Sequence, residues 1–358
     1  MGALPHPGKA LGISTARDSA GMVADMPDLV TLGEIMLRLT TPGQQRFVQA
    51  PHFEVTPGGA EANVAVLIAQ LGGSAEFVTR VPVHDLGQRA VDELRRYGVG
   101  TRQILRGGER MGLYFLEQGA SQRPGRVIYD RAGSAFSEAK PGDFDWEKIF
   151  AGARWFHWSG ITPGVSESAA ALTAEACVAA KALGLTVSFD LNYRAKLWSR
   201  ERAGEVLAPL MAHVDLCVTS AEEAQGVFGL PVPESGPERE RVAAEALRER
   251  FGFGQVALTM RRGEVADRTE WGAMLLSGGQ AHFSPRHEIT IVDRVGAGDA
   301  FTGALIFALL RGDAPQTAVH FAVAASTLQH TISGDFPLFT LEEVEALVRG
   351  GSGGRVAR

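Results

Sequence analysis

Cysteine is scarce in this chain, which has only Cys177 and Cys217 among 358 residues. Neither belongs to a Cys-x-x-Cys or Cys/His pattern, so no disulfide framework or zinc site is expected, and we predict two buried, reduced thiols. No stretch reaches the roughly 18 apolar residues of a membrane span. The net charge is −6, from 35 basic and 41 acidic residues, and it provides no basic face for nucleic acid.

The two ends of the chain contain few residues that could enter a core. Residues 1–27 are rich in Gly, Ala, Pro and Ser and lack the compact apolar segment of a secretory signal, so we expect a disordered extension, with Met26 as an alternative start. We expect the Gly-rich segment 348–358 to be a flexible tail. Residues 28–347 have an ordinary composition and are long enough for one folded domain, which we expect to be cytoplasmic.

Short apolar runs alternate with helical patterns along this domain. A first buried strand is predicted at 28–33, and similar runs follow at 155–159, 186–190, 216–219 and 255–259. Helical segments such as 167–183 and 243–251 separate them. Alternation of this kind predicts an α/β fold, in which a mostly parallel sheet is covered by helices on both faces.

Two stretches depart from this alternation towards β structure. They lie at about 35–56 and 111–135, and in the second the segments 112–117 and 126–131 are predicted to pair as a hairpin. Together they favour a second, smaller sheet outside the main one.

The motif that indicates chemistry lies late in the chain, at 291–303. A predicted strand ends near Asp293, a loop of small residues follows at Gly296, Ala297 and Gly298, and a predicted helix covers 299–310. The first N–H groups of a helix have no partner within it, and the helix dipole favours an anion at that end. Asp299 would stand beside a bound phosphate as a base for a hydroxyl group. The alternative is an ordinary helix cap after a tight turn.

A second Gly-rich turn precedes the helical run 64–71. It contains Gly58, Gly59, Ala60, Glu61 and Asn63, which could present backbone amides and a side-chain amide to sugar hydroxyls. Taken alone, a Gly-Gly turn with a helix-capping Asn is the better interpretation of this segment. About 235 residues separate the two motifs, so we expect them to form opposite walls of one cleft.

The pair of motifs, in this order and at this separation, resembles the two signatures of the ribokinase-like (PfkB-type) carbohydrate kinases. The resemblance covers nearly all of 28–347. It implies a three-layer α/β/α sandwich with a mostly parallel sheet and a small β-sheet lid over the sugar, formed by 35–56 and 111–135. It also implies ATP as the phosphoryl donor, Mg²⁺, a monovalent cation such as K⁺ near Asp293, and a homo-oligomer.

Within this family the chain resembles the branch that phosphorylates the sugar acid 2-keto-3-deoxygluconate. The matching stretches are 112–117, 129–135, 159–163 and 190–198. The resemblance implies that Tyr114, Tyr129 and Arg131 line the pocket for the acid. It also implies that Asn192 and Arg194 reach the phosphates or the substrate. A guanidinium group pairs with a carboxylate or a phosphate through two hydrogen bonds, which agrees with this assignment.

The resemblance also covers the segments expected to bind the metal and the nucleotide, although some residues there differ from those common in the family. Glu223 occupies the position of a Glu that organises Mg²⁺, but Ser220 replaces the common Asn, and a Ser-capped helix with an acidic first turn is the alternative. On the nucleotide side, Arg261 or Arg262 stands in place of a Lys, followed by Gly263.

Three further residues are open to functional and structural interpretations. Arg294 either approaches the phosphate from within the late motif or turns outward. Arg38 could reach the substrate, but an exposed strand charge is the simpler expectation. His157, between two tryptophans, is expected to be structural.

Three other functions compete with a sugar-acid kinase. The first is the same reaction on another sugar, such as fructose, ribose or a nucleoside. The second is a regulator that binds nucleotide without catalysis, which the retained Asp299 disfavours. The third is a dehydrogenase, which is disfavoured because the N-terminal Gly-x-Gly-x-x-Gly of a dinucleotide site is absent from the sequence.

Overall fold

The computed structural model describes residues 26–236, 238–263 and 265–351. Nearly all of the expected disordered extension, and residues 352–358 of the expected tail, therefore lie outside the described residues. Within them, no helix is long and apolar enough to cross a bilayer. Both cysteines are buried free thiols, as expected.

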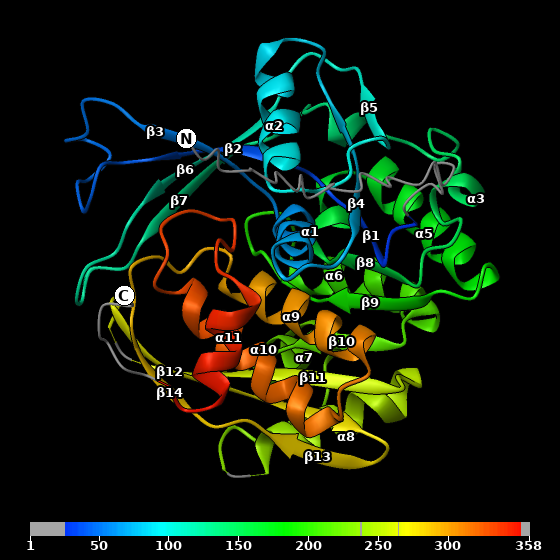
Figure 1. Cartoon of the computed structure of the whole chain (residues 1–358), viewed down its shortest axis with the longest axis vertical. Coiled ribbons are helices and arrows are strands. Elements are labelled where there is room, and N and C mark those ends of the chain that lie inside the picture. Colours follow the sequence, from blue (N-terminus) through cyan, green and yellow to red (C-terminus); the bar gives the residue numbers. More distant parts are fainter. Residues whose placement is uncertain (1–25, 237, 264, 352–358) are drawn as a thin grey trace, which may run out of the picture.

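The largest element in the described part of the chain is a ten-stranded sheet, shown in Figure 1. Strands β5, β4, β1, β8, β9, β10 and β11 run parallel in that order, and antiparallel β12, with β13 and β14 paired to it, closes one edge. The strands are β1 (Leu29–Leu32), β4 (Ala75–Val81), β5 (Ile104–Arg106), β8 (Trp155–Ser159), β9 (Thr186–Asp190), β10 (Leu216–Thr219), β11 (Gln255–Arg262), β12 (Arg268–Ser277), β13 (Gln280–Phe283) and β14 (His287–Thr290).

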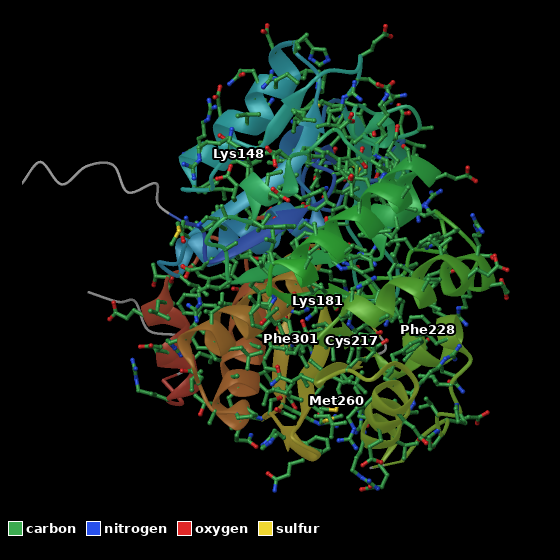
Figure 2. The ribbon with its side chains drawn as sticks, turned by 90° about the vertical axis from the view of Figure 1, so that its right-hand side faces the viewer. Lys148, Lys181, Cys217, Phe228, Met260 and Phe301 are labelled. Atoms are coloured by element: carbon green, nitrogen blue, oxygen red, sulfur yellow. The ribbon has the colours of Figure 1, made fainter. Side chains whose placement is uncertain are left out.

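Helices cover both faces of this sheet and form one apolar core on each side. One layer is α1 (Ala60–Gln70), α2 (Asp85–Arg96), α9 (Ala297–Arg311), α10 (Pro315–Gln329) and α11 (Leu341–Val348). The other is α3 (Trp146–Ile149), α4 (Ile161–Val165), α5 (Glu167–Ala182), α6 (Arg200–Leu207), α7 (Ala221–Phe228) and α8 (Arg239–Phe251). In Figure 2, Phe301 of the first layer and Cys217 of β10 lie inside the molecule, where both are fully buried. The expected three-layer α/β/α class is confirmed.

A separate four-stranded sheet extends from one side of this body, at the upper left of Figure 1. Its order is β3 (Glu54–Gly58), β2 (Met36–Thr40), β6 (Gly112–Glu117) and β7 (Arg126–Asp130). The β6–β7 hairpin pairs antiparallel as expected, whereas β2 and β6 pair in parallel although they lie far apart in the sequence. We call these four strands the lid sheet, because one of its faces closes the cavity described below.

The strands that were predicted most accurately are buried on both faces. The bounds of β8, β9 and β10 agree with the prediction. Strands β8 and β10 are mainly apolar, whereas β9 alternates the apolar Val187 and Phe189 with polar residues. The prediction that a strand ends near Asp293 is wrong, because β14 ends at Thr290, where it pairs antiparallel with β12. The helix expected from Asp299 begins two residues earlier, at Ala297.

Candidate functional site

A cavity of about 420 Å³ lies where the parallel strands end, between the main sheet and the lid sheet. Its floor is the carboxyl ends of β9, β10 and β11 and the start of α9, and its roof is the inner face of the lid sheet. This is the usual place for a ligand in an open α/β sheet. Lining it are Met36, Gly59, Ala60, Asn63, Tyr114, Val127, Tyr129, Arg131, Ile161, Asp190, Asn192, Arg194, Val218, Thr219, Glu223, Thr259, Arg261, Trp271, Arg294, Val295, Gly296, Gly298, Asp299 and Asp335.

The start of α9 presents unpaired backbone donors to this cavity. Gly296 caps the helix in the left-handed conformation, with φ of 81°, and a Cβ atom there would lie 2.3 Å from the carbonyl oxygen of Asp335. Only glycine fits such a position without strain. Gly298, by contrast, has open space around it. The turn therefore leaves room for an anion over the first N–H groups of the helix. The side chain of Ala297 is buried and does not line the cavity.

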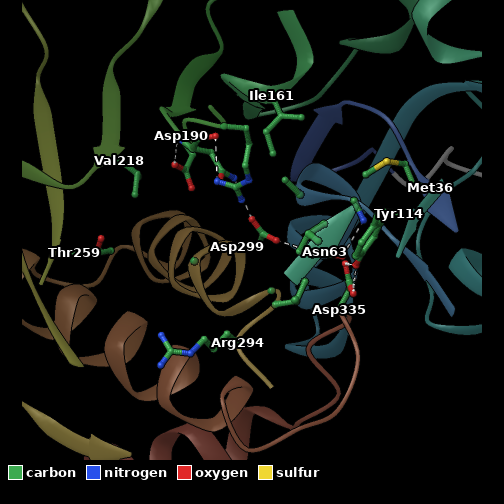
Figure 3. Close-up of a pocket in the computed structure, with 18 of the residues that line it drawn as sticks. Met36, Asn63, Tyr114, Ile161, Asp190, Val218, Thr259, Arg294, Asp299 and Asp335 are labelled. Carbon is green, nitrogen blue, oxygen red and sulfur yellow. Dashed lines mark hydrogen bonds between the residues drawn. The ribbon is translucent and has the colours of Figure 1, made fainter. Parts of the chain in front are cut away.

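Asp299 stands in the first turn of α9 and faces the cavity. Its carboxylate accepts a hydrogen bond from the Asn63 Nδ2 at 2.6 Å and one from the Asn192 Nδ2 at 3.4 Å. Burial raises the pKa of Asp299 to about 7, against the lowering effects of the Asn63 hydrogen bond and of Arg194. Figure 3 shows Asp299 between Asn63 and Asp190. A carboxylate with such a pKa is well matched to accept a proton near neutral pH.

The Gly-rich turn before α1 also borders the cavity, but it lies beside the start of α9 and not opposite it, because α1 and α9 pack against each other in the same helical layer. Gly59, Ala60 and Asn63 line the cavity, and the Gly59 N–H donates to the Asn63 Oδ1 at 3.3 Å, which directs the Asn63 N–H₂ group towards Asp299. Gly58 and Glu61 do not line it. The expectation of a ligand contact by Glu61 disagrees with the structure, because its buried carboxylate turns inward.

The inward contacts of Glu61 account for this difference. Its Oε1 accepts hydrogen bonds from the Ser159 N–H at 3.0 Å, the Ser159 hydroxyl at 2.6 Å and the Thr162 hydroxyl at 2.7 Å. Burial raises its pKa, although the hydroxyl donors oppose that shift. Glu61 thus links the start of α1 to the end of β8 and to α4, and it does not border the cavity.

Tyr114, Tyr129 and Arg131 come together on the lid side of the cavity, as predicted. The guanidinium of Arg131 forms an ion pair with Glu34, in which Nε lies 2.8 Å from Oε2, and it lies 5.8 Å from the centre of the Tyr129 ring. Arg131 is 8% exposed. Its orientation is therefore fixed by Glu34, while one edge of the group still borders the cavity.

A second group of polar side chains follows β9 and β10. Asn192 has a left-handed backbone, with φ of 40°, and donates its N–H to Asp190 at 3.0 Å. Burial raises the pKa of Asp190 well above its usual value, and Glu223 and Asp299 raise it further. Burial also raises the pKa of Glu223, although Arg194 lowers it. The cavity is bordered by all of these residues, namely Asp190, Asn192, Arg194, Glu223 and Asp299. Three carboxylates and one guanidinium group therefore face the same space.

Only some of the residues predicted to bind the nucleotide border the cavity. Arg261 lines the cavity with its guanidinium 5.5 Å from the centre of the Trp271 ring, whereas Gly263 borders a separate shallow depression. Arg294 points away from Asp299 in Figure 3. It donates to the carbonyl oxygens of Val265 and Ala266 at 2.8–2.9 Å, so it is held by the backbone of that segment.

Sequence reasoning missed a buried ion-pair network beneath the lid. Arg38, expected to be exposed, is 1% exposed and pairs with both Asp293 and Asp335, lying 2.8 Å from the latter. The Tyr114 hydroxyl donates to both oxygens of Asp335 at 2.6 Å. No local pattern marks Asp335 in the sequence, since its partners lie more than 200 residues earlier. His157 is buried and bonded to Ser188 at 2.8 Å, and burial lowers its pKa to about 3, consistent with a structural role.

Comparison with known proteins gives one consistent set of relatives. Residues 26–335 match the family model described as pfkB family carbohydrate kinase. A 2-dehydro-3-deoxygalactonokinase of Haloferax volcanii is 37% identical over 91% of this chain and 98% of its own length, and a 2-dehydro-3-deoxygluconokinase of Thermoproteus tenax is 32% identical over 87% and 90%. The crystal structure of a 2-dehydro-3-deoxygluconokinase from Thermotoga maritima superposes with a TM-score of 0.88, at 50% identity over 90% of this chain and 98% of that one.

Proposed function

The chain belongs to the pfkB family of carbohydrate kinases, and we propose that it transfers the γ-phosphoryl group of ATP to the primary hydroxyl of 2-keto-3-deoxygluconate. The product would be 2-keto-3-deoxy-6-phosphogluconate. The observation that carries this proposal is the position of Asp299, in the first turn of α9 and inside a cavity with arginine on the opposite side.

The start of α9 supplies the chemistry of the transfer. The Asp299 carboxylate takes the proton of the acceptor hydroxyl, the hydroxyl oxygen forms a bond to the γ-phosphorus, and the bond to the bridging oxygen breaks to release ADP. Charge on the migrating group is stabilised by the amides of Gly296, Ala297 and Gly298 and by the helix dipole. Asn63 holds the base in place through its 2.6 Å hydrogen bond.

The lid side of the cavity suits an acid rather than a neutral sugar. Arg131 is held by Glu34 so that its remaining N–H groups can meet a carboxylate, and Tyr114 and Tyr129 provide hydroxyls beside it. Gly59, Ala60 and Asn63 would contact the sugar hydroxyls. The names of the relatives include both the gluconate and the galactonate forms, so both acids are candidate substrates.

ATP would lie along the polar residues after β9 and β10. Asn192 and Arg194 would contact its phosphates, with Arg261 and the amides of Gly296 and Gly298 nearby. The described residues contain no cluster of three metal-binding side chains. Mg²⁺ would be held by the phosphates of the nucleotide and by Glu223, whose carboxylate borders the cavity and offers hard oxygen ligands. Bound there, Mg²⁺ would neutralise charge on the β- and γ-phosphates.

Self-association is a further part of the proposal. On the outer face of the lid sheet, Leu39, Phe115 and Ile128 lie side by side in register, and Ile128 is 49% exposed. An apolar row of this kind is suited to pack against another copy. Light scattering on the purified protein tests this, and a monomer at all concentrations would contradict it.

A substrate panel tests the proposed function. ADP release would be measured with 2-keto-3-deoxygluconate, 2-keto-3-deoxygalactonate, fructose, ribose and adenosine, and the product identified by mass. We expect kcat/KM for one or both acids to exceed that for the neutral compounds by about 100-fold or more, which is the worth of one charge-assisted pair. Equal values for fructose and the acids would contradict acid specificity.

A variant of Arg131 tests whether this residue recognises the carboxylate of the substrate. Arg131→Met keeps the length of the side chain and removes its charge, so it should raise KM for the acids by about 10–100-fold and leave that for fructose nearly unchanged. Arg126→Met is the matched control, because Arg126 is exposed at the far end of β7, the strand that Arg131 follows.

A further inference from the structure

The carboxylate of Asp293, just before the anion-binding turn, is fully engaged by donors from the protein. Its Oδ1 accepts the N–H of Val295 at 3.1 Å, and its Oδ2 accepts the N–H of Gly334 at 3.1 Å. The guanidinium of Arg38 also contacts Oδ2. Both charged groups are buried, at 1% and 3% exposure. The positive charge beside this turn therefore comes from β2, in the lid sheet.

Three backbone carbonyl groups lie beside the same carboxylate and are also engaged. The oxygens of Val295, Gly334 and Asp335 converge on the Nε2 of Gln329, at 3.4, 3.0 and 3.5 Å. Gln329 is fully buried at the end of α10. A carboxylate surrounded by carbonyl oxygens is the donor set of a monovalent cation, whose hydration shell such oxygens replace. In this chain N–H groups occupy that position, so the residues do not fit the expected K⁺.

We propose that Arg38 and Gln329 together take the place of a monovalent cation, so that this kinase works without potassium. This inference rests on the proposed function, because it concerns the order of the turn that would bind phosphate. Arg38 supplies the charge that Asp293 requires, and the two N–H donors of the Gln329 amide are shared among the three carbonyls. Arg38 is thus a positioning residue, which acts on the transferring group through Asp293 and the turn that follows it.

The arrangement also connects the turn to the substrate wall. The second nitrogen of the Arg38 guanidinium lies 2.8 Å from Asp335, which borders the cavity, and Nε donates to Thr40 at 2.6 Å. One rigid, planar group thereby fixes Asp293 and Asp335 relative to each other, which a spherical ion could not do. The lid sheet, the phosphate-binding turn and the sugar wall therefore share one anchor.

The first test is the response of the unaltered protein to potassium. Rates with 2-keto-3-deoxygluconate and magnesium ATP would be measured in tetramethylammonium buffers free of potassium and ammonium. Potassium would then be added to about 100 mM at constant ionic strength. We expect kcat and both KM values to change by less than about twofold. Activation of tenfold or more would overturn the inference. If no sugar is phosphorylated under any condition, the proposed function itself fails, so the two failures are distinguishable.

The second test removes the internal cation. Arg38→Met should lower kcat by about 10–100-fold, and added guanidinium or potassium should restore it several-fold, whereas Arg38→Lys should retain more activity in their absence. Arg89→Met is the matched control, since Arg89 is exposed and donates a hydrogen bond to the backbone carbonyl of Val55 in the lid region. A folded Arg38→Met variant that is slow and unresponsive to either cation would show a packing role alone and overturn the inference.

A third variant tests the same inference if Arg38→Met does not fold. Gln329→Glu places a carboxylate among the three carbonyls and should turn the position into a cation site. We expect potassium to raise the melting temperature of this variant and not that of the unaltered protein. An equal response of both proteins to potassium would overturn the inference.

Discussion

At the scale of single residues, Asp299 is the group on which the proposed reaction depends most directly. Replacing it by Asn keeps the shape and removes the base, so kcat should fall by about 10²–10⁴-fold while ATP affinity, measured by calorimetry, stays within about threefold. Asp313→Asn, just beyond the other end of α9, is the control and should remain fully active. Unchanged turnover of Asp299→Asn would contradict the mechanism.

The raised pKa of Asp299 predicts how activity depends on pH. With a pKa of about 7, the carboxylate is protonated below that pH and cannot accept a proton from the substrate. We therefore expect kcat/KM to fall about tenfold per pH unit on the acid side of about pH 7 and to level off above it. A profile that stays flat down to about pH 5 would show that the free protein carries no base with this pKa.

The same pKa predicts that folding stability decreases as pH rises, whereas activity increases. In the unfolded chain an Asp titrates near 3.9, so between about pH 4 and 7 the folded state binds more protons, and stability decreases as pH rises. Asp299→Asn removes this penalty. At about pH 8 its melting temperature should exceed that of the unaltered protein by roughly a few degrees, and the difference should vanish near pH 4. A lower melting temperature at pH 8 would contradict the assigned shift.

Single-residue roles were predictable only where a short motif marked them. Asp299 and Asn63 lie in such motifs, and the structure places them 2.6 Å apart. Arg38 and Asp335 pair across 297 positions, and neither has neighbours in the sequence that reveal the other. Glu61 lies in a motif but turns away from the cavity, because the motif marks the backbone of the turn and not every side chain in it.

At the scale of elements, the two glycines at the start of α9 should respond differently to substitution by alanine. Gly296→Ala adds a Cβ that would lie 2.3 Å from the Asp335 carbonyl in a left-handed conformation, so it should lower stability by about 1–3 kcal/mol and abolish most activity. Gly298→Ala has open space, so stability should be unchanged, while KM for ATP rises because the new methyl group borders the phosphate position. Thermal unfolding and initial rates check both, and equal destabilisation by the two would contradict this reading.

Elements buried on both faces were predictable, and those at the edge of the sheet were not. Strands β8, β9 and β10 are buried along nearly their whole length, which is typical of central parallel strands, although β9 alternates polar and apolar residues. The segment before Asp293 also contains apolar residues, but β14 ends at Thr290 and pairs antiparallel with β12. Composition does not determine strand partners at an edge, because the pairing depends on how the rest of the sheet closes.

At the scale of the whole molecule, polar contacts near the nucleotide wall join the lid sheet to the body in addition to the buried contacts of Arg38 and Tyr114. The Ala266 N–H donates to the Ser121 carbonyl at the tip of the β6–β7 hairpin at 2.7 Å, and Arg294 holds the Val265 and Ala266 carbonyls from the other side. Lys196 also contacts the Val127 carbonyl of β7. Closure over the cavity should therefore depend on Arg294.

Removing Arg294 tests this dependence. Arg294→Met should raise KM for the sugar acid by about 3–30-fold with a smaller change in kcat, because charge-assisted hydrogen bonds of about 1.5–3 kcal/mol no longer hold Val265 and Ala266, the segment to which the hairpin tip is bonded. Arg286→Met is the control, since its exposed ion pair with Glu270 lies on β12, away from the hairpin. A fall in kcat alone would instead indicate that Arg294 acts on the phosphate.

The separation of Arg38 from Asp335 also has a consequence for synthesis of the protein. A ribosome adding about 5–20 residues per second takes roughly 15–60 s to pass from one to the other. During that interval the nascent chain already contains β2 and the Gly-rich turn, but it has neither the late helix nor the two acidic partners of Arg38. The ion pairs that anchor the phosphate-binding turn to the lid sheet therefore cannot be complete before Asp335 has been synthesised.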